Sequence, residues 1–235
     1  MKLKNVIKLK FLYLINKTII IVFALISFII ILTFLLEGIN ANQDNSYKIA
    51  LELYNQNSYM YLKVIMTFFS VYLFSYSISF KNDFLIYLLL PIGVSKLKSF
   101  FSTIIVNVII IYFMFCALFV SYNLIGVSFI KIYSFELEYI LIFSRIYLVV
   151  LIYGLYAMIL MQLLNNNFTL ILIIALFVLS NNYYENNELN LFIVYLLPNV
   201  NTHGEIFVNA FYLLIYALEL TLFSYYLYNR RDLNY

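Results

Sequence analysis

Charged residues are scarce in this sequence: only 11% of its 235 residues are Asp, Glu, Lys or Arg. An ordinary soluble domain carries about 25% charged residues. With 65% hydrophobic residues and a mean hydropathy of +0.96, this chain lacks the polar side chains that a water-exposed surface needs. The composition therefore predicts an integral membrane protein, organised as a single transmembrane domain over residues 1–235.

Helix breakers are scarce as well, with 5 glycines and 2 prolines in the whole chain. Long helices suit that composition better than a barrel does. A transmembrane barrel would show alternating segments of about ten residues, and the sequence contains none. We therefore expect an all-α membrane fold.

Residues that carry most catalytic chemistry are nearly missing. The single cysteine, Cys116, lies in an apolar run and excludes a disulfide framework. The single histidine, His203, is accompanied by no H-E-x-x-H motif, no Cys/His cluster and no pair of intramembrane aspartates. No G-x-x-x-x-G-K-[ST] phosphate-binding loop occurs either. We expect no metal, no cofactor and no ATPase site in this chain, and no enzymatic activity of its own.

What the sequence does contain is a series of long apolar segments. A bilayer core of about 30 Å requires about 20 helical residues, since each residue rises about 1.5 Å. Six segments are predicted to span the membrane, near residues 18–36, 59–80, 100–122, 139–161, 168–182 and 206–226. The fifth is the shortest, and the apolar run after it ends at Pro198. We expect an outer re-entrant segment there, with Pro198 as a candidate for an outer gate.

The distribution of basic residues predicts the orientation of these spans. Ten of the 14 basic residues fall on one side of the membrane in the six-span arrangement. They are Lys2, Lys4, Lys8, Lys10, Lys17, Lys81, Lys96, Lys98, Arg230 and Arg231. Because lysine and arginine collect on the cytoplasmic side of membrane proteins, both termini are predicted to be cytoplasmic.

Residues 1–17 form a basic segment that leads into the first span. Drawn as a helix, it places Leu3, Ile7, Phe11 and Leu14 on one face, with Lys10 close to that stripe. One interpretation is an amphipathic helix in the cytoplasmic interface, with its lysines among anionic headgroups. The other is a positive flank whose only role is to orient the first span.

A second short segment, residues 81–98, lies between the second and third spans. Asp83 is a candidate helix cap, the apolar run that follows is too short to cross a bilayer, and Pro91 and Gly93 are predicted to end it. This pattern predicts a short cytoplasmic helix. It is either an ordinary interfacial helix that completes a hairpin or an element that receives force from a cytoplasmic partner.

Three polar residues fall inside predicted spans and are candidates for function. Asn107 lies in the third span, Arg145 about 10 Å from the outer end of the fourth, and Glu219 about 20 Å from the outer end of the sixth. Charges at membrane depth usually face a bundle interior or a wet cavity. Outward snorkelling of Arg145 and an interhelical hydrogen bond of Glu219 are the structural alternatives.

The arrangement of the 81–98 segment between spans resembles the permease subunits of type-2 ABC exporters. In that family the loop between the second and third spans has a polar start, a leucine-rich run, a proline with a turn, and basic residues that enter the third span. Here "DFLIYLLLPIGVSKLKSF" follows that order. The resemblance gives an ATPase-coupling role to Asp83, Leu85, Leu88, Leu89, Pro91, Gly93, Lys96 and Lys98.

The resemblance also implies partners. It implies a dimer of permeases, like or unlike, carried by a separate cytoplasmic ABC ATPase subunit that holds ATP and Mg²⁺. Small exporters of this kind are similar to those that export bacteriocins and cytolytic peptides or confer immunity to them. The abundance of Ile, Asn, Lys, Tyr and Phe is typical of an AT-rich bacterial genome. We therefore expect a permease of a bacterial cell membrane, surrounded by lipid, that moves a hydrophobic or amphipathic peptide outward, with no nucleic-acid partner.

Two other classes of protein fit parts of the pattern. A stand-alone immunity or scaffold protein would bind a peptide or a membrane partner without ATP, and it would tolerate charge reversal in the 81–98 segment. An intramembrane enzyme acting on lipid or prenyl chains would need clustered acids at the inner face, where only Asp83 and Asp232 occur.

Overall fold

The protein is described by a computed structural model that covers residues 2–15, 17–43, 47–79, 89, 92–130, 136–164, 168–185 and 206–230. Every regular element within these residues is a helix, so the all-α prediction is confirmed for this part of the chain. The helices are α1 (Leu3–Leu14), α2 (Lys17–Gln43), α3 (Tyr47–Ile78), α5 (Lys96–Phe129), α6 (Leu137–Leu164), α7 (Phe168–Glu185) and α9 (Ile206–Arg230).

Five of these helices, α2, α3, α5, α6 and α9, are long and apolar enough to cross a membrane. They indicate a multi-pass membrane protein, because each supplies the length that a bilayer core requires. The fifth predicted span corresponds to α7, whose apolar part, Leu170–Ser180, gives only about 17 Å of helix. A sixth crossing therefore stays a prediction.

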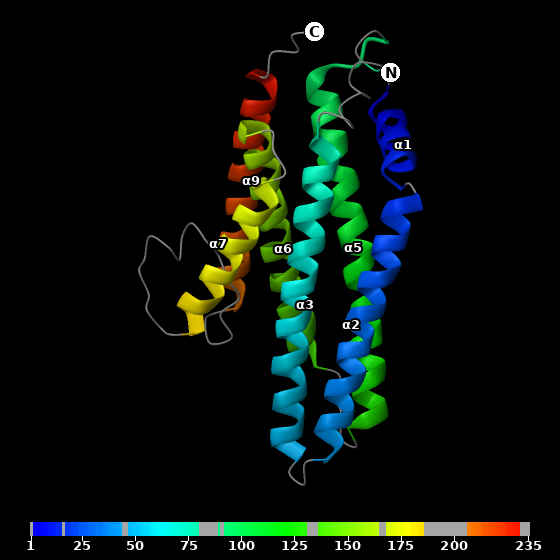
Figure 1. The fold of residues 1–235 in the computed structure, drawn as a ribbon, viewed down its shortest axis with the longest axis vertical. Helices are drawn as coiled ribbons and strands as arrows, with labels where there is room; N and C mark the ends of the chain where they lie inside the picture. The colour runs from blue at the N-terminus through cyan, green and yellow to red at the C-terminus, as the bar shows by residue number, and fades with distance from the viewer. Residues whose placement is uncertain are drawn as a thin grey trace.

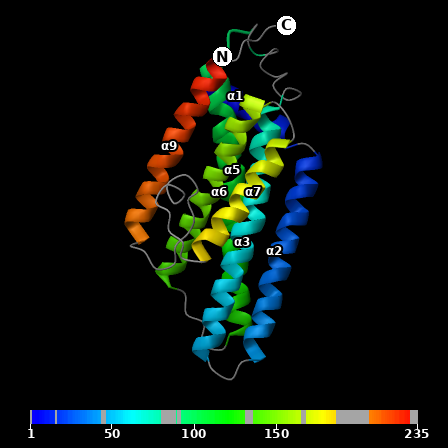
Figure 2. The same ribbon diagram turned by 60° about the vertical axis from the view of Figure 1, so that its left-hand side comes forward.

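The long helices form a bundle in which successive members run in alternating directions (Figure 1). Helices α3 and α6 occupy the centre and pack on each other. Helix α2 packs on α3 and α5, while α9 packs on α6, so that α2 and α9 lie on opposite sides of the bundle in both views (Figure 2). The short helix α1 packs on α5.

Helices α2, α3 and α5 extend well beyond the apolar segments predicted for them, and α2 ends at Gln43 rather than near residue 36. Helix α3 begins at Tyr47 rather than near residue 59, and α5 continues to Phe129 rather than ending near residue 122. Contacts between the extended ends of α3 and α5 stabilise both: the Tyr54 hydroxyl donates to the Tyr122 carbonyl at 2.8 Å, and their rings stack at 5.1 Å. Hydropathy detects the part of a helix that lies in lipid, and it does not detect a polar end that is stabilised by a neighbouring helix.

The contact between α3 and α6 depends on a glycine. A Cβ atom at Gly154 of α6 would overlap with the Ser70 hydroxyl oxygen and the Phe74 ring of α3. Small residues allow close approach of helices in membranes, where packing replaces the hydrophobic effect as the source of stability. Gly154 therefore sets the distance between the two central helices.

We expect Gly154→Ala to lower the stability of the bundle by about 1–3 kcal/mol, because the added methyl group overpacks the α3–α6 contact. The matched control is Gly38→Ala. A Cβ at Gly38 would have its nearest neighbour, the Ile125 side chain, at 3.1 Å, which is farther than the Ser70 and Phe74 atoms that a Cβ at Gly154 would meet. The midpoint of thermal unfolding in a mild detergent measures both variants. An equal decrease in the two would contradict the role given to Gly154.

Candidate functional site

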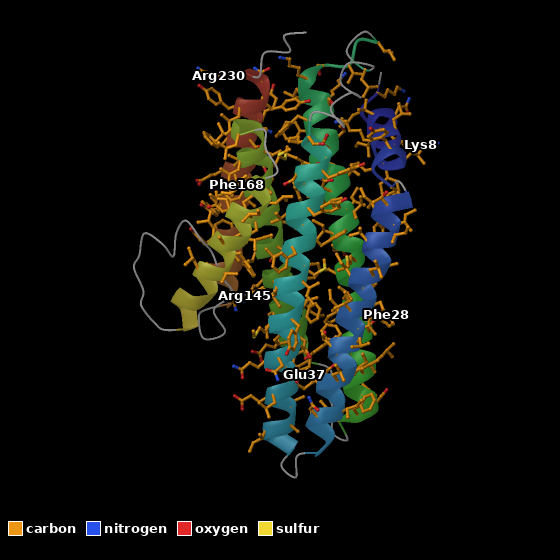
Figure 3. The ribbon with its side chains drawn as sticks, viewed as in Figure 1. Lys8, Phe28, Glu37, Arg145, Phe168 and Arg230 are labelled. Carbon is orange, nitrogen blue, oxygen red and sulfur yellow. The ribbon has the colours of Figure 1, made fainter. Side chains whose placement is uncertain are left out.

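Basic side chains gather at one end of the bundle, where α1, the start of α5 and the end of α9 meet. Lys8 and Arg230 mark this end and Glu37 lies toward the opposite end (Figure 3). We call this end the basic end and define it by Lys2, Lys4, Lys8, Lys10, Lys96, Lys98 and Arg230. It is the end for which the positive-inside rule predicts the cytoplasm.

The described part of the 81–98 segment forms a tight turn at the basic end. Gly93 has a φ of +79°, a left-handed conformation that glycine adopts without steric cost. The backbone N–H groups of Ile92 and Val94 both donate to the Leu89 carbonyl, at 3.2 and 3.1 Å. The bond from Val94, the residue after the left-handed glycine, to the carbonyl five residues earlier is the 6→1 bond of the Schellman arrangement. We call Leu89, Ile92, Gly93 and Val94 the Gly93 turn.

The Gly93 turn rests on α1. Leu89 and Val94 form a buried apolar cluster with Val6 of α1. An apolar contact between the residues on the two sides of the glycine is the usual companion of a Schellman turn. Here the contact also includes a second helix, so a displacement of the turn would be transmitted to α1.

The exit of the turn is tied to α5 and α9. The Ser95 hydroxyl caps α5 by accepting from the backbone N–H of Lys98 at 3.3 Å. One residue on, the Lys96 ammonium donates to the Asn229 carbonyl of α9 at 3.4 Å. The turn therefore contacts α1 and leads directly into a helix that is bonded to α9.

Helix α1 docks through a face that differs from the predicted stripe. Its buried residues are Val6, Lys10 and Leu14, of which only Leu14 belongs to the predicted stripe, and Leu3 of that stripe is 39% exposed. Spacing of four residues aligns the three buried side chains on one face. The predicted stripe is thus corrected in part: Leu14, Ile7 and Phe11 do face the core, Leu3 does not, and Lys10 belongs to the face that contacts α5.

Lys10 is buried, with 5% of its side chain exposed. Its ammonium donates to the Ser99 carbonyl at 2.8 Å and to the Thr103 hydroxyl, both on α5. Hydrogen bonds from a charged donor are stronger than neutral ones. They offset the cost of removing the ammonium from water, so that the lysine holds α1 against α5.

The structure brings together four of the residues assigned to ATPase coupling by resemblance. Leu89, Gly93, Lys96 and Lys98 all lie at the basic end, within the Gly93 turn or the first turn of α5. The other residues assigned to coupling or to the outer gate lie outside the described residues. They are Asp83, Leu85, Leu88, Pro91 and Pro198.

The three polar residues inside the spans have different surroundings. Asn107 is fully buried, and its amide donates to the Ser77 hydroxyl of α3 at 2.8 Å, which is a bond between helices. Arg145 is 1% exposed, so its side chain lies inside the bundle rather than at the lipid-facing surface. Glu219 is exposed on α9. Arg145 and Glu219 are therefore not joined in one buried pair.

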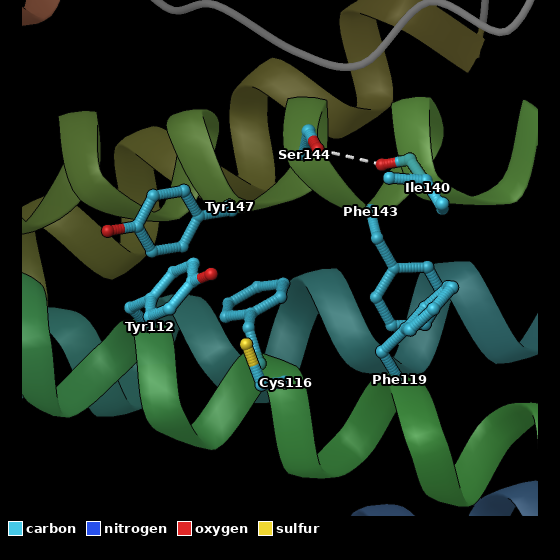
Figure 4. A pocket seen from close by; sticks show the side chains of 8 residues that line it. Tyr112, Cys116, Phe119, Ile140, Phe143, Ser144 and Tyr147 are labelled. Carbon is cyan, nitrogen blue, oxygen red and sulfur yellow. Dashed lines mark hydrogen bonds between the residues drawn. The ribbon is translucent and has the colours of Figure 1, made fainter. Parts of the chain in front are cut away.

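An aromatic groove of about 180 Å³ lies between α5 and α6 (Figure 4). Its lining residues are Tyr112, Phe115, Cys116, Phe119, Ile140, Phe143, Ser144 and Tyr147. The Ser144 hydroxyl is used within its own helix, where it donates to the Ile140 carbonyl at 2.7 Å. The surface that remains is mostly aromatic, which suits an apolar occupant.

Sequence reasoning did not find the groove or the docking role of Lys10. The groove combines residues from two helices. In the sequence of each helix alone, apolar residues are distributed on all sides, so that no face is marked as a binding surface. For Lys10 a signal existed, since Val6, Lys10 and Leu14 share one spacing of four residues. That signal points to a protein neighbour for the lysine rather than to lipid.

Among the described residues, no group of His, Cys, Asp and Glu is arranged to hold a metal ion. Comparison with protein-family models, with curated proteins and with solved structures finds no match for this chain. The site must therefore be interpreted from its own geometry.

We expect Thr103→Val to weaken the docking of α1. The substitution keeps the shape of the side chain and removes an acceptor from the buried Lys10 ammonium, at a cost of about 1.5–3 kcal/mol for a charged hydrogen bond. Hydrogen exchange in detergent should then be faster across α1 and unchanged in α3.

The matched control for this experiment is Thr221→Val. Both threonines donate to the carbonyl four residues earlier, Thr103 to Ser99 at 3.1 Å and Thr221 to Ala217 at 2.8 Å, but only Thr103 accepts from a lysine. Unchanged protection of α1 in Thr103→Val would show that Lys10 does not hold this helix.

Proposed function

We propose that this chain is the membrane permease subunit of an ATP-driven ABC exporter, with ATP and Mg²⁺ held by a separate cytoplasmic ATPase subunit. The observation that carries the proposal is the Gly93 turn. It presents an exposed apolar side chain, Ile92, at the basic end, and it is joined to α1, α5 and α9. An exporter without its own nucleotide site needs an element of this kind to receive force from its ATPase.

The connections of the turn supply a route for that force. A push on Ile92 reaches α1 through the Val6 cluster, and it reaches α5 directly along the chain through the Ser95 cap. Helices of this length move as rigid bodies, because their backbone hydrogen bonds lie within each helix. A small displacement at the basic end would thus change the packing of α5 along the whole bilayer.

The substrate that fits best is a hydrophobic or amphipathic peptide, moved outward across a bacterial cell membrane for export or self-immunity. The groove between α5 and α6 supports this class, because its walls are aromatic and one of its two helices, α5, follows directly on the Gly93 turn. Aromatic walls bind apolar side chains without requiring one defined sequence. Six spans, cytoplasmic termini and an outer re-entrant segment complete the proposed architecture.

We expect Ile92→Asp to reduce co-purification of the ATP-binding subunit and to reduce ATP-dependent export, because a carboxylate replaces the exposed apolar contact. Leu89 is unsuitable for this test since it is buried in the cluster with Val6. The measurement is affinity purification of the tagged chain from its native membrane in mild detergent, followed by identification of the proteins that accompany it.

The matched control for Ile92→Asp is Val127→Asp. Both side chains are 64% exposed, and Val127 lies near the opposite end of α5. The control should retain the ATP-binding subunit. If the unmodified chain purifies without any nucleotide-binding protein and still protects cells from a peptide, the exporter proposal is wrong, and the chain acts as a stand-alone immunity or scaffold protein.

A further inference from the structure

The aromatic groove between α5 and α6 has a buried floor and exposed rims (Figure 4). Phe115 and Phe143 are buried and form its floor. Tyr112 of α5 and Ile140 of α6 are exposed and form its rims. Both helices are long and apolar enough to cross the membrane, so the groove opens toward lipid. The molecules that surround its opening are therefore those of the bilayer.

The length and depth of the groove match one leaflet. Its lining residues lie within 112–119 of α5 and 140–147 of α6, which is about 10 Å along each helix. One leaflet supplies about 15 Å of the bilayer core. Helix α5 begins at the basic end and α6 runs in the opposite direction, so the groove lies near the start of α6, in the leaflet at the other end (Figure 1). It can hold most of one acyl chain of that leaflet.

A carboxyl group lies at the headgroup end of the groove. Glu136 directly precedes α6, and its carbonyl accepts from the backbone N–H of Tyr139 at 3.1 Å as the helix begins. Glu136, Ile140 and Ser144 are spaced by four residues, which places Glu136 on the face of α6 that lines the groove. Two residues make about half a helical turn, so Glu138 lies on the other side of α6.

The charge at this end selects the headgroup. A carboxylate attracts a cationic group and repels an anionic one. The described residues of α5 at this end, 119–129, carry no charge, so Glu136 is the charged group beside the described walls of the groove. Glu136 also interacts within the chain. Its two carboxylate oxygens together accept about four hydrogen bonds, so an ammonium group can bind beside that partner.

We propose that the groove binds one acyl chain of a phospholipid whose headgroup carries an ammonium group, such as phosphatidylethanolamine, with that ammonium beside Glu136. The aromatic walls cover the apolar chain, and the carboxylate accepts a charge-assisted hydrogen bond from the headgroup. A phospholipid joins these two features at the spacing that the groove presents. The site does not depend on the proposed transport function, and a peptide that entered the groove would displace the lipid chain.

Quenching of tryptophan fluorescence by brominated lipid chains tests the site, because the chain contains no tryptophan of its own. Tyr112→Trp places the reporter at the end of the groove away from Glu136. The matched control is Phe113→Trp: the two side chains are neighbours on α5 and are 55% and 63% exposed, but only Tyr112 lines the groove. Each variant is reconstituted in vesicles of equal parts phosphatidylethanolamine and phosphatidylglycerol, one of which is brominated in its chains.

In Tyr112→Trp, brominated phosphatidylethanolamine should quench more strongly than brominated phosphatidylglycerol, by about two- to fivefold as expected for an exposed ion pair. In Phe113→Trp the two lipids should quench equally. Equal quenching in Tyr112→Trp, or the same preference in Phe113→Trp, would overturn the proposal. If neither lipid quenches Tyr112→Trp, protein rather than lipid covers the groove, and the proposal is again wrong.

Two further substitutions in the Tyr112→Trp background test the carboxyl group. Glu136→Gln should remove the preference for phosphatidylethanolamine, and Glu138→Gln, on the other side of α6, should keep it. A preference that survives Glu136→Gln would show that this carboxylate does not recognise the headgroup. These outcomes are separate from the purification experiment: absence of the lipid preference with retention of an ATP-binding subunit would reject the lipid site and keep the exporter, and the reverse result would reject the exporter alone.

Discussion

The close approach of α3 and α6 at Gly154 is the contact on which the remaining arrangement depends. Helices α2, α5 and α7 pack on α3, and α5, α7 and α9 pack on α6, so every other long helix is positioned relative to this pair. Within a bilayer, apolar side chains gain nothing by leaving lipid, and association comes from close packing and from hydrogen bonds between helices. Gly154 provides the close packing, with Ser70 and Phe74 of α3 directly against it.

Polar side chains in the membrane-spanning helices form two groups: those that are hydrogen-bonded to a neighbouring helix, and those that are exposed on the surface of the bundle. Asn107 bonds to Ser77 across α5 and α3, and Tyr156 bonds to Tyr216 across α6 and α9, so these residues hold helices together. Glu219 is the contrasting case, because its side chain is exposed on α9 and is not buried between helices.

The basic end combines features that would be unremarkable separately. A Schellman turn, a capped helix and a docked amphipathic helix are each ordinary, but here the turn joins α1, α5 and α9 at one place. That junction is the basis of our proposal that the 81–98 segment receives force from a cytoplasmic partner. The buried lysine of α1 makes the junction firm, because its ammonium bonds to two oxygen atoms of α5.

The sequence by itself determined the class of the molecule. Low charge and long apolar runs predicted an all-helical membrane protein and located the five full-length helices, because hydrocarbon leaves backbone polar groups no partner except within a helix. The sequence also pointed to a turn at Gly93, which has a left-handed backbone conformation that few other residues adopt. Only the tertiary structure decided which face of α1 is buried, how far α3 and α5 extend, that Arg145 is inside and that Glu219 is outside. These outcomes depend on which helix packs against each side chain. The hydropathy of a sequence does not specify which helices become neighbours.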